Sequence, residues 1–326
     1  MEPWYPEETG TPGLGGLPPT DRSPAQHPPA GPGAGKAGRT SPRRDVSFEN
    51  SPLSDNDFEP HFRSGPRCES KGSIEVVLPA LNEEKGVGNV IDRIPRDKLV
   101  QSGFQVRVWV VDGKSKDATL EVARNRGANT FVQTGDGKGN GVRQLLDHII
   151  ADGRGPDQGS RVFVMLDADG SYPPEAIPKF VEALKAGSDV VVGSRFLGEV
   201  QEGAITPLNR LGNRILSRLA GFLFGTPVSD VCTGMWAFRE DSLRRLGLAA
   251  DGFDLEADLF ASSCESGARL RELPIDYHRR IGDPKLVPLR TGLLIAWRLL
   301  LKRLNRREGV VPRIDRRKAS LVEDAT

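Results

Sequence analysis

Short runs of apolar and often β-branched residues alternate with amphipathic segments through the middle of the chain. The runs of strand length are residues 73–79, 105–111, 131–133, 161–166 and 189–193. Between them, apolar side chains recur every three or four residues, which is the spacing of one face of a helix. Strands that are near-continuous apolar runs and alternate with helices are typical of a parallel sheet covered on both faces. The pattern therefore predicts an α/β fold with a mostly parallel sheet.

Towards the C-terminus the pattern is less regular. It predicts helices over residues 208–224 and 257–264, and an edge strand over residues 269–277 that Pro274 interrupts. Residues 289–304 form a last predicted helix, which lies in a membrane interface or docks on the domain with an exposed basic face. Its apolar stripe contains Leu293, Trp297, Leu300, Leu301 and Leu304, and the basic residues beside it are Arg290, Arg298, Lys302 and Arg303.

Composition divides the chain into three parts. Residues 1–72 contain 13 of the 25 prolines and 10 of the 37 glycines, so we expect a disordered tail there. A folded unit over residues 73–288 and a basic amphipathic helix and tail over residues 289–326 follow. We find no signal peptide and no run of about 18 uncharged apolar residues, so the sequence predicts a protein that does not span a membrane.

Charge and cysteine usage exclude several classes of function. A net charge of +1 and only three tyrosines disfavour nucleic-acid binding. The spacings of Cys68, Cys232 and Cys264 fit neither a disulfide framework nor a zinc site, so we expect a reducing, cytoplasmic compartment. No serine or cysteine hydrolase pattern occurs, and neither His148 nor His278 has a partner in the sequence that suggests catalysis.

Two carboxylates follow the predicted strand over residues 161–166. They belong to Asp167 and Asp169, one residue apart, at the strand end where ligands bind in open parallel sheets. Such a pair can hold a divalent cation that neutralises a diphosphate leaving group. The alternative is that the two aspartates only cap the next helix.

Two further strand ends carry candidate ligand groups. Asp112 ends the second predicted strand, where its carboxylate can accept hydrogen bonds from a nucleobase edge. Capping of the next helix is the alternative for Asp112, and Asp117 or Thr119 is a candidate for the same role. The turn at residues 137–139 offers a diphosphate its backbone amides, a positive helix end and the cation of Lys138, although it is not a Walker loop.

Basic residues gather after the predicted sheet. They are Arg195, Arg210, Arg214, Arg279, Arg280 and Lys285. As a group they can bind a second phosphate, whereas a solvated basic face is the alternative for any one of them.

These motifs occur in a specific order. They are 77–84 (VLPALNEE), 111–119 (VDGKSKDAT), 137–139 (GKG), 167–169 (DAD) and 193–195 (GSR), followed by 230–234 (DVCTG), 273–275 (LPI), 279–280 (RR) and 284–286 (PKL). Together they resemble a family 2 glycosyltransferase of the GT-A fold, in particular the polyprenyl-phosphate or dolichol-phosphate mannosyl- and glucosyltransferases. The resemblance spans about residues 73–305 and makes residues 73–288 a GT-A domain with a Rossmann-like sheet.

The resemblance implies an inverting, metal-dependent transferase that moves a hexose from a nucleotide sugar to polyprenyl phosphate. It assigns the donor nucleoside to Pro79, Ala80, Glu83 and Asp112. It assigns the donor diphosphate, with Mg²⁺ or Mn²⁺, to Asp167 and Asp169, and the turn described above adds Lys138 as a donor ligand. It assigns the acceptor phosphate to Arg195, Arg210, Arg280 and Lys285. Catalysis then rests on Asp167, Asp169 and Arg195, because an acceptor that is already an anion needs no strong general base.

Two positions depart from the family pattern. Gly113 stands where a second aspartate often follows Asp112, which leaves uridine and guanosine open, with uridine favoured. Ser171 stands where mannosyltransferases carry a glutamine metal ligand.

Two alternatives to this function remain. They are a transferase that uses a soluble acceptor, and a non-catalytic nucleotide-sugar-binding protein. Lipid access would depend on the C-terminal helix, so we expect peripheral contact with the inner face of the cell membrane.

Overall fold

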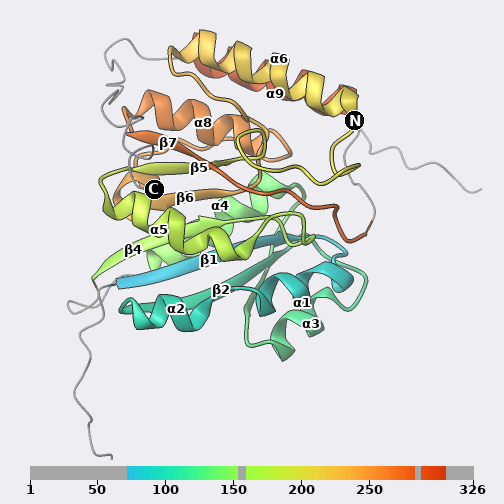
Figure 1. Cartoon of the computed structure of the whole chain (residues 1–326), viewed down its shortest axis with the longest axis vertical. Helices are drawn as coiled ribbons and strands as arrows, with labels where there is room; N and C mark the ends of the chain where they lie inside the picture. The colour runs from blue at the N-terminus through green and yellow to red at the C-terminus, as the bar shows by residue number, and fades with distance from the viewer. Residues whose placement is uncertain (1–71, 153–158, 283–287, 306–326) are drawn as a thin grey trace, which may run out of the picture. The chain divides into compact units, whose positions relative to one another are not determined.

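Figure 1 shows the chain as a computed structural model. The structure describes residues 72–152, 159–282 and 288–305, which belong to one compact unit. The predicted N-terminal tail, apart from Gly72, lies outside the described residues, as do Lys285 and the segment after residue 305. Within the described ranges, no helix has the length and apolar content that crossing a membrane requires.

The described residues contain seven strands, which form one sheet in the order β3-β2-β1-β4-β6-β5-β7. Their bounds are β1 Gly72–Ala80, β2 Phe104–Asp112, β3 Asn129–Val132, β4 Ser160–Met165, β5 Val190–Ser194, β6 Trp236–Arg239 and β7 Leu270–Pro274. Only β6 runs antiparallel to its neighbours in this part of the chain. The five predicted parallel strands are confirmed, and the predicted edge strand is β7, which ends at Pro274.

The sequence pattern missed β6, which lies between β4 and β5. Its four residues are too few to show a period, and the strands that it pairs with lie far from it in the sequence. Trp236 pairs with Met165 of β4 and Val192 of β5, and its ring Nε1 donates to the Thr233 carbonyl over 2.7 Å. Tertiary pairing, rather than a local pattern, therefore makes this segment a strand.

Helices cover both faces of the sheet. One layer contains α1 (Glu84–Asp92), α2 (Arg96–Gln101), α3 (Thr119–Asn125) and α5 (Ile177–Lys185). The other contains α4 (Lys138–Ala151), α6 (Pro207–Phe224), α7 (Glu240–Leu243), α8 (Leu255–Glu265) and α9 (Pro288–Leu304). In Figure 1, α6 and α9 run side by side at the top of the view.

The central strands contribute apolar side chains to both layers because alternate residues of a strand point to opposite faces. On β1, Val76 packs in the layer of α1 and α5, whereas Val77 packs in the layer of α4 and α8. Val164 and Met165 of β4 divide in the same way. Because both faces are covered, apolar residues predominate on both faces of these strands instead of alternating with polar residues.

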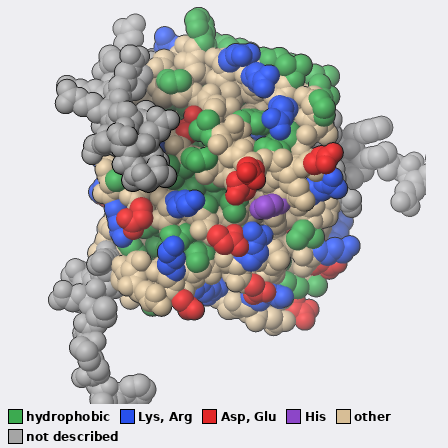
Figure 2. Space-filling model, in the orientation of Figure 1, with side chains coloured by type: hydrophobic (Ala, Val, Ile, Leu, Met, Phe, Trp, Pro, Cys, Tyr) green, Lys and Arg blue, Asp and Glu red, His purple; other side chains and the backbone are tan. Residues whose placement is uncertain are grey.

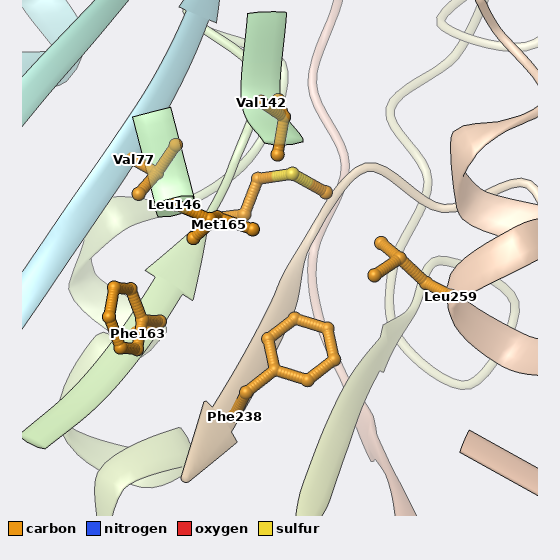
Figure 3. A pocket seen from close by; sticks show the side chains of 7 residues that line it. All are labelled: Val77, Val142, Leu146, Phe163, Met165, Phe238 and Leu259. Atoms are coloured by element: carbon orange, nitrogen blue, oxygen red, sulfur yellow. The ribbon is translucent and has the colours of Figure 1, made fainter. Parts of the chain in front are cut away.

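A void of about 10 Å³ lies between the sheet and the helices α4 and α8 (Figure 3). Its lining is apolar and consists of Val77, Val142, Leu146, Phe163, Met165, Phe238 and Leu259. That volume barely accommodates one water molecule, and an apolar lining offers it no hydrogen bonds. We therefore regard the void as a packing gap in the core.

Candidate active site

The carboxyl ends of β1, β2 and β4 meet at one edge of the sheet because the three strands are parallel. Pro79 and Ala80 end β1, and Ala80 pairs with Asp112 at the end of β2. Asp167 follows the end of β4. The structure thus brings the residues predicted for the donor to one edge of the sheet.

The loops that follow β1 and β2 are held together by hydrogen bonds. The Asn82 N–H donates to Ser115 Oγ over 2.8 Å, and Asn82 Oδ1 accepts from the Lys116 N–H over 2.8 Å. The Glu83 N–H donates to Thr119 Oγ1, also over 2.8 Å. Asn82 has a φ of 52°, in the left-handed region that asparagine tolerates. The rim of the site beside Asp112 is therefore a bound pair of loops.

The carboxylate of Asp112 is buried at this rim, with 1% of the residue exposed. Its Oδ2 accepts from the N–H groups of Lys114 and Ser115, each over 3.0 Å. Its Oδ1 is also buried and has no hydrogen-bond partner within the described residues. A buried acceptor without a donor is costly, so this oxygen is suited to receive an N–H group from a ligand.

Asp117 binds the start of α3, in keeping with the capping role considered for Asp117 or Thr119, although the N-cap residue itself is Ala118. Its carboxylate accepts from the N–H of Thr119, the first residue of α3, over 3.0 Å, and from the Glu84 N–H over 3.2 Å. Burial alone would raise the pKa of Asp117, but the hydrogen bonds from Thr119 and Glu84 lower it overall. Asp117 thus stabilises the loops around the candidate site.

Lys138, the first residue of α4, joins two carboxylates. Its Nζ lies 2.6 Å from Asp167 Oδ1 and 2.6 Å from Glu256 Oε1. Burial alone would lower the pKa of Lys138, but the two carboxylates raise it above its ordinary range. Burial raises the pKa of Glu256, and Lys138 only partly opposes that effect. The three charged groups form one cluster that carries a net negative charge when all are ionised.

Glycines allow the backbone to close around this cluster. Gly137 has a φ of 99°, and a Cβ there would stand 2.1 Å from the Asp251 carbonyl oxygen. A Cβ on Gly234 would stand 2.5 Å from the Asp167 carboxylate. Larger residues at either position would displace the groups that surround Lys138.

The sequence analysis missed Glu256. It lies in the first turn of α8, where an acidic residue is common because it favours the helix dipole, so the position itself indicates no function. Only the packing of α8 against the start of α4 places its carboxylate on Lys138.

Asp169 is held by a different cation. Its Oδ1 accepts from the N–H of Ser171 over 2.9 Å and from the Ser171 hydroxyl, and its Oδ2 is paired with the Arg280 guanidinium. The Ile281 N–H donates to the Asp169 carbonyl over 2.8 Å, and the His278 N–H donates to the Ser171 carbonyl over 2.9 Å. The segment that carries Arg280 is therefore bound along the loop of Asp169.

The side chains at this edge fit a hard divalent cation only in part. Asp167 and Asp169 offer carboxylate oxygens, but no cluster of three or more His, Cys, Asp or Glu side chains suited to a metal occurs in the described residues. The Ser171 hydroxyl is buried and bound to Asp169. Mg²⁺ is commonly held by one or two carboxylates together with substrate phosphates, and that arrangement suits this pair of aspartates.

Arg195, at the end of β5, is bound to a buried carboxylate. Its Nε and Nη2 lie 2.7 Å from the two oxygens of Asp230, which also accepts from Asn213 Nδ2 over 2.7 Å. Burial alone would lower the pKa of Arg195, but Asp230 raises it well above its ordinary range. The guanidinium also lies over the Tyr277 ring, 5.2 Å from its centroid. Arg195 is therefore a fixed, permanent cation.

The other predicted phosphate ligands are distributed differently. Arg210 lies on α6 over the ring of Phe196, 5.3 Å from its centroid, and Arg195 contacts the same ring at 5.8 Å. Arg280 is on Asp169, and Lys285 lies outside the described residues. Arg214 is exposed on α6, and Arg279 donates to the Glu202 carbonyl over 2.7 Å. The structure thus brings Arg195 and Arg210 together around one aromatic ring.

The Glycosyl transferase family 2 profile matches residues 75–247. The chain therefore belongs to glycosyltransferase family 2, and it is an enzyme of the GT-A fold. The expected fold class and family are confirmed.

Three relatives indicate which members of the family the chain resembles. It is 36% identical to the dolichyl-phosphate hexose transferase of Haloferax volcanii, over 68% of this chain and 90% of that protein. It is 35% identical to glycosyltransferase AglJ of the same organism, over 68% of this chain and 69% of that protein. It is 30% identical to the undecaprenyl-phosphate mannosyltransferase of Micrococcus luteus, over 65% of this chain and 87% of that protein.

Solved structures share the fold. Glucosyl-3-phosphoglycerate synthase from Mycobacterium tuberculosis, solved with Mn²⁺, uridine diphosphate and glucosyl-3-phosphoglycerate, superposes with a TM-score of 0.54. The match covers 74% of this chain and 84% of the synthase at 23% identity, so it concerns the fold alone.

Proposed function

We propose that the enzyme transfers a hexose from a uridine-diphosphate sugar to a polyprenyl phosphate such as dolichyl phosphate. The named acceptors of the Haloferax and Micrococcus relatives support this acceptor class. The observation that carries the proposal is the buried Oδ1 of Asp112, which has no hydrogen-bond partner among the described residues. It lies at the same sheet edge as the clusters around Lys138 and Arg280.

The state of the Asp112 carboxylate favours uracil over guanine. Uracil presents one ring N–H between two carbonyls, whereas the corresponding edge of guanine presents two neighbouring donors. Oδ2 of Asp112 already accepts two backbone N–H groups, so within the described residues only Oδ1 remains for the base. The carboxylate therefore cannot pair side-on with the two neighbouring donors of guanine, whereas the single ring N–H of uracil needs only Oδ1. In this proposal Pro79, Ala80 and Glu83 complete the nucleoside pocket beside Asp112.

We assign the donor diphosphate to Lys138 and to Asp167 and Asp169. The two aspartates would hold Mg²⁺ or Mn²⁺, which neutralises the charge that develops on the diphosphate as it leaves. Lys138 supplies a cation at the positive end of α4. The backbone amides that the sequence also offered there are not all available, because the Gly139 and Asn140 N–H groups donate to the Gly252 and Asp251 carbonyls. Metal binding by the two aspartates and diphosphate binding by Lys138 both require that two ion pairs rearrange. These are the pairs of Lys138 with Asp167 and of Arg280 with Asp169.

We assign the acceptor phosphate to Arg195, Arg210, Arg280 and Lys285. Within the described residues, Arg195 uses Nε and Nη2 on Asp230, and Nη1 remains for a ligand. A phosphate oxygen of the acceptor attacks C1 of the sugar, and the bond from C1 to the diphosphate breaks with its electron pair on the nucleoside diphosphate. Direct displacement inverts C1, and the anionic nucleophile requires no strong base.

We further propose that the enzyme contacts the cytoplasmic face of the cell membrane through α6 and α9. Large apolar side chains on α9 are exposed, including Leu293 at 66% and Trp297 at 58%, and Leu211 and Ile215 of α6 are exposed at 52% and 56%. Figure 2 shows hydrophobic side chains along the upper end of the molecule, where Figure 1 places α6 and α9. An apolar surface with arginines beside it suits a membrane interface with anionic lipids.

The proposal is tested by incubating the purified protein and Mg²⁺ or Mn²⁺ with polyprenyl phosphate and labelled UDP- and GDP-sugars. Acid-labile label in the organic phase from a UDP-sugar is the expected result. Asp169→Ala should abolish the transfer while the protein stays folded, and full activity of this variant would exclude the role of Asp169.

The same assay separates the alternatives. Arg195 and Arg210 suit any phosphate monoester, so a soluble phosphorylated acceptor is the second candidate. Label that appears only in an aqueous product, with phosphoglycerate as the acceptor, would favour it. Nucleotide binding without turnover on any acceptor would indicate a non-catalytic binding protein.

A further inference from the structure

Helix α9 turns two of its basic side chains towards the domain. Arg298 Nε donates to Asp254 Oδ2 over 2.6 Å, and Lys302 Nζ lies 2.8 Å from Asp258 Oδ1. Only 21% of the Arg298 side chain and 13% of the Lys302 side chain are exposed. Helix α9 thus docks on the domain, which was one of the two alternatives from the sequence. The exposed basic face expected with that alternative is wrong for Arg298 and Lys302, because Asp254 and Asp258 at the start of α8 offer them buried carboxylates.

The two carboxylates belong to the first turn of α8 and its N-cap. Asp254 and Asp258 are 2% and 0% exposed, and they stand on either side of Glu256 in the sequence. Three buried acidic groups lie at this end of α8, and Lys138 pairs with one of them, Glu256. Removal of the cations of α9 would take away the partners that Asp254 and Asp258 have on that helix, which is costly for buried charges. Arg298 and Lys302 therefore stabilise the placement of this end of α8.

Asp254 and Asp258 also bind the backbone of residues 249–252, the segment that leads into α8. Asp258 Oδ2 accepts from the Ala249 and Ala250 N–H groups over 2.5 and 2.7 Å. Asp254 Oδ1 accepts from the Gly252 N–H over 3.2 Å. The carboxylates that α9 neutralises thus hold segment 249–252 in place.

Segment 249–252 lies directly on the start of α4. The Gly139 N–H donates to the Gly252 carbonyl over 3.2 Å, and the Asn140 N–H donates to the Asp251 carbonyl over 2.9 Å. A Cβ on Gly139 would stand 2.4 Å from the Ala250 carbonyl oxygen, so the two backbones are in close contact. This turn of α4 also carries Lys138, which reaches Asp167.

We propose that Arg298 and Lys302 are positioning residues for the donor site, acting through Asp254, Asp258 and segment 249–252 on the turn that carries Lys138. The helix that presents an apolar face to the outside is then also a structural part of the catalytic centre. The relevance to catalysis rests on the proposed function, whereas the positioning itself can be tested on the protein alone.

The test compares Lys302→Gln and Arg298→Gln with Arg303→Gln, which removes the same charge from an exposed position of α9. Amide hydrogen exchange is measured on the full chain without ligands. We expect exchange at Gly139 and Asn140 to become at least tenfold faster in the first two variants and to stay unchanged in the third. Unchanged exchange, or an equal acceleration throughout β1 and β2, would overturn the proposal, since the latter indicates only a general loss of stability.

A second measurement tests whether this positioning affects binding of the donor nucleotide. The dissociation constant for uridine diphosphate with Mn²⁺ should rise about tenfold in Lys302→Gln and Arg298→Gln, with the KM for the acceptor unchanged. If the wild-type enzyme binds no nucleotide, the proposed function is wrong. The hydrogen-exchange measurement would still show whether Arg298 and Lys302 position the start of α4. Two independent variants keep the test decisive if one of them does not fold.

Discussion

The guanidinium of Arg195 is bound by the fully buried carboxylate of Asp230 through two contacts of 2.7 Å. Removal of either partner of a buried ion pair leaves the other charge buried without a counter-charge, so each residue stabilises the other. The pair lies at the end of β5, where the proposed acceptor phosphate requires a permanent cation.

Replacement of Asp230 by asparagine should therefore affect both stability and activity. Asp230→Asn leaves the mostly buried Arg195 cation without its counter-charge, and we expect a loss of about 3 kcal/mol in the free energy of unfolding. Denaturant unfolding measures the loss, and Asp147→Asn, at an exposed position of α4, is the control. Stability equal to that of the control would contradict the structural role of the pair.

Replacement of Asp112 by asparagine should change the recognition of the base. The amide oxygen of asparagine can keep the hydrogen bonds from Lys114 and Ser115, which places an N–H₂ group where Oδ1 now lies. Two donors then face each other across the pocket, so we expect uridine diphosphate to bind about 10- to 100-fold more weakly. Cytosine presents an acceptor at that position, so cytidine diphosphate should lose less affinity.

Isothermal titration with both nucleotides measures this change. Asp136→Asn, a change at an exposed partner of Lys114, is the matched control and should leave both affinities unchanged. An Asp112→Asn variant that keeps full affinity for uridine diphosphate would show that the base binds elsewhere.

The ion pair of Asp189 and Arg269 predicts a pH dependence of stability. Asp189 Oδ2 lies 2.9 Å from Arg269 Nε at the edge between β5 and β7. Burial alone would raise the pKa of Asp189, but Arg269 lowers it below the ordinary value of 3.8. The stabilisation is therefore complete above pH 3.8 and is lost as the pH falls through the lower pKa of the folded state.

Thermal unfolding of the wild type and Asp189→Asn across acidic pH measures this effect. At neutral pH the variant should be less stable by about 1 kcal/mol, since half-exposed ion pairs contribute little. The difference should shrink below pH 3.8. A difference that grows on acidification would have the wrong sign for a lowered pKa.

The apolar face of α9 should determine membrane binding. Leu293→Glu combined with Trp297→Glu places two charges on this face, and we expect at least a tenfold loss of binding to vesicles that contain anionic lipids. Val100→Glu, at a position 56% exposed on α2, is the control. Activity on a short, water-soluble polyprenyl phosphate should remain.

Sedimentation with vesicles measures the binding, and light scattering gives the oligomeric state. A wild-type dimer that the double variant converts to a monomer, with vesicle binding unchanged, would instead make this face an interface between two copies of the chain.

The local pattern of the sequence determined most of the fold and indicated part of the candidate site. Continuous apolar runs are a direct consequence of strands buried on both faces, so the parallel strands and their polar ends were predictable. Asp112 ends a strand, and Asp167 and Asp169 follow one, so the sequence indicated these three residues as candidates.

Tertiary structure decided the features that depend on contacts between distant segments. The four residues of β6 become a strand only by pairing with β4 and β5. Glu256 faces Lys138 because α8 packs on the start of α4, and Lys302 points inward because α8 offers a buried carboxylate. The spacing of apolar residues in the sequence indicates which side of a helix or strand is buried. The partner of a charged side chain depends instead on which helices and strands pack against each other.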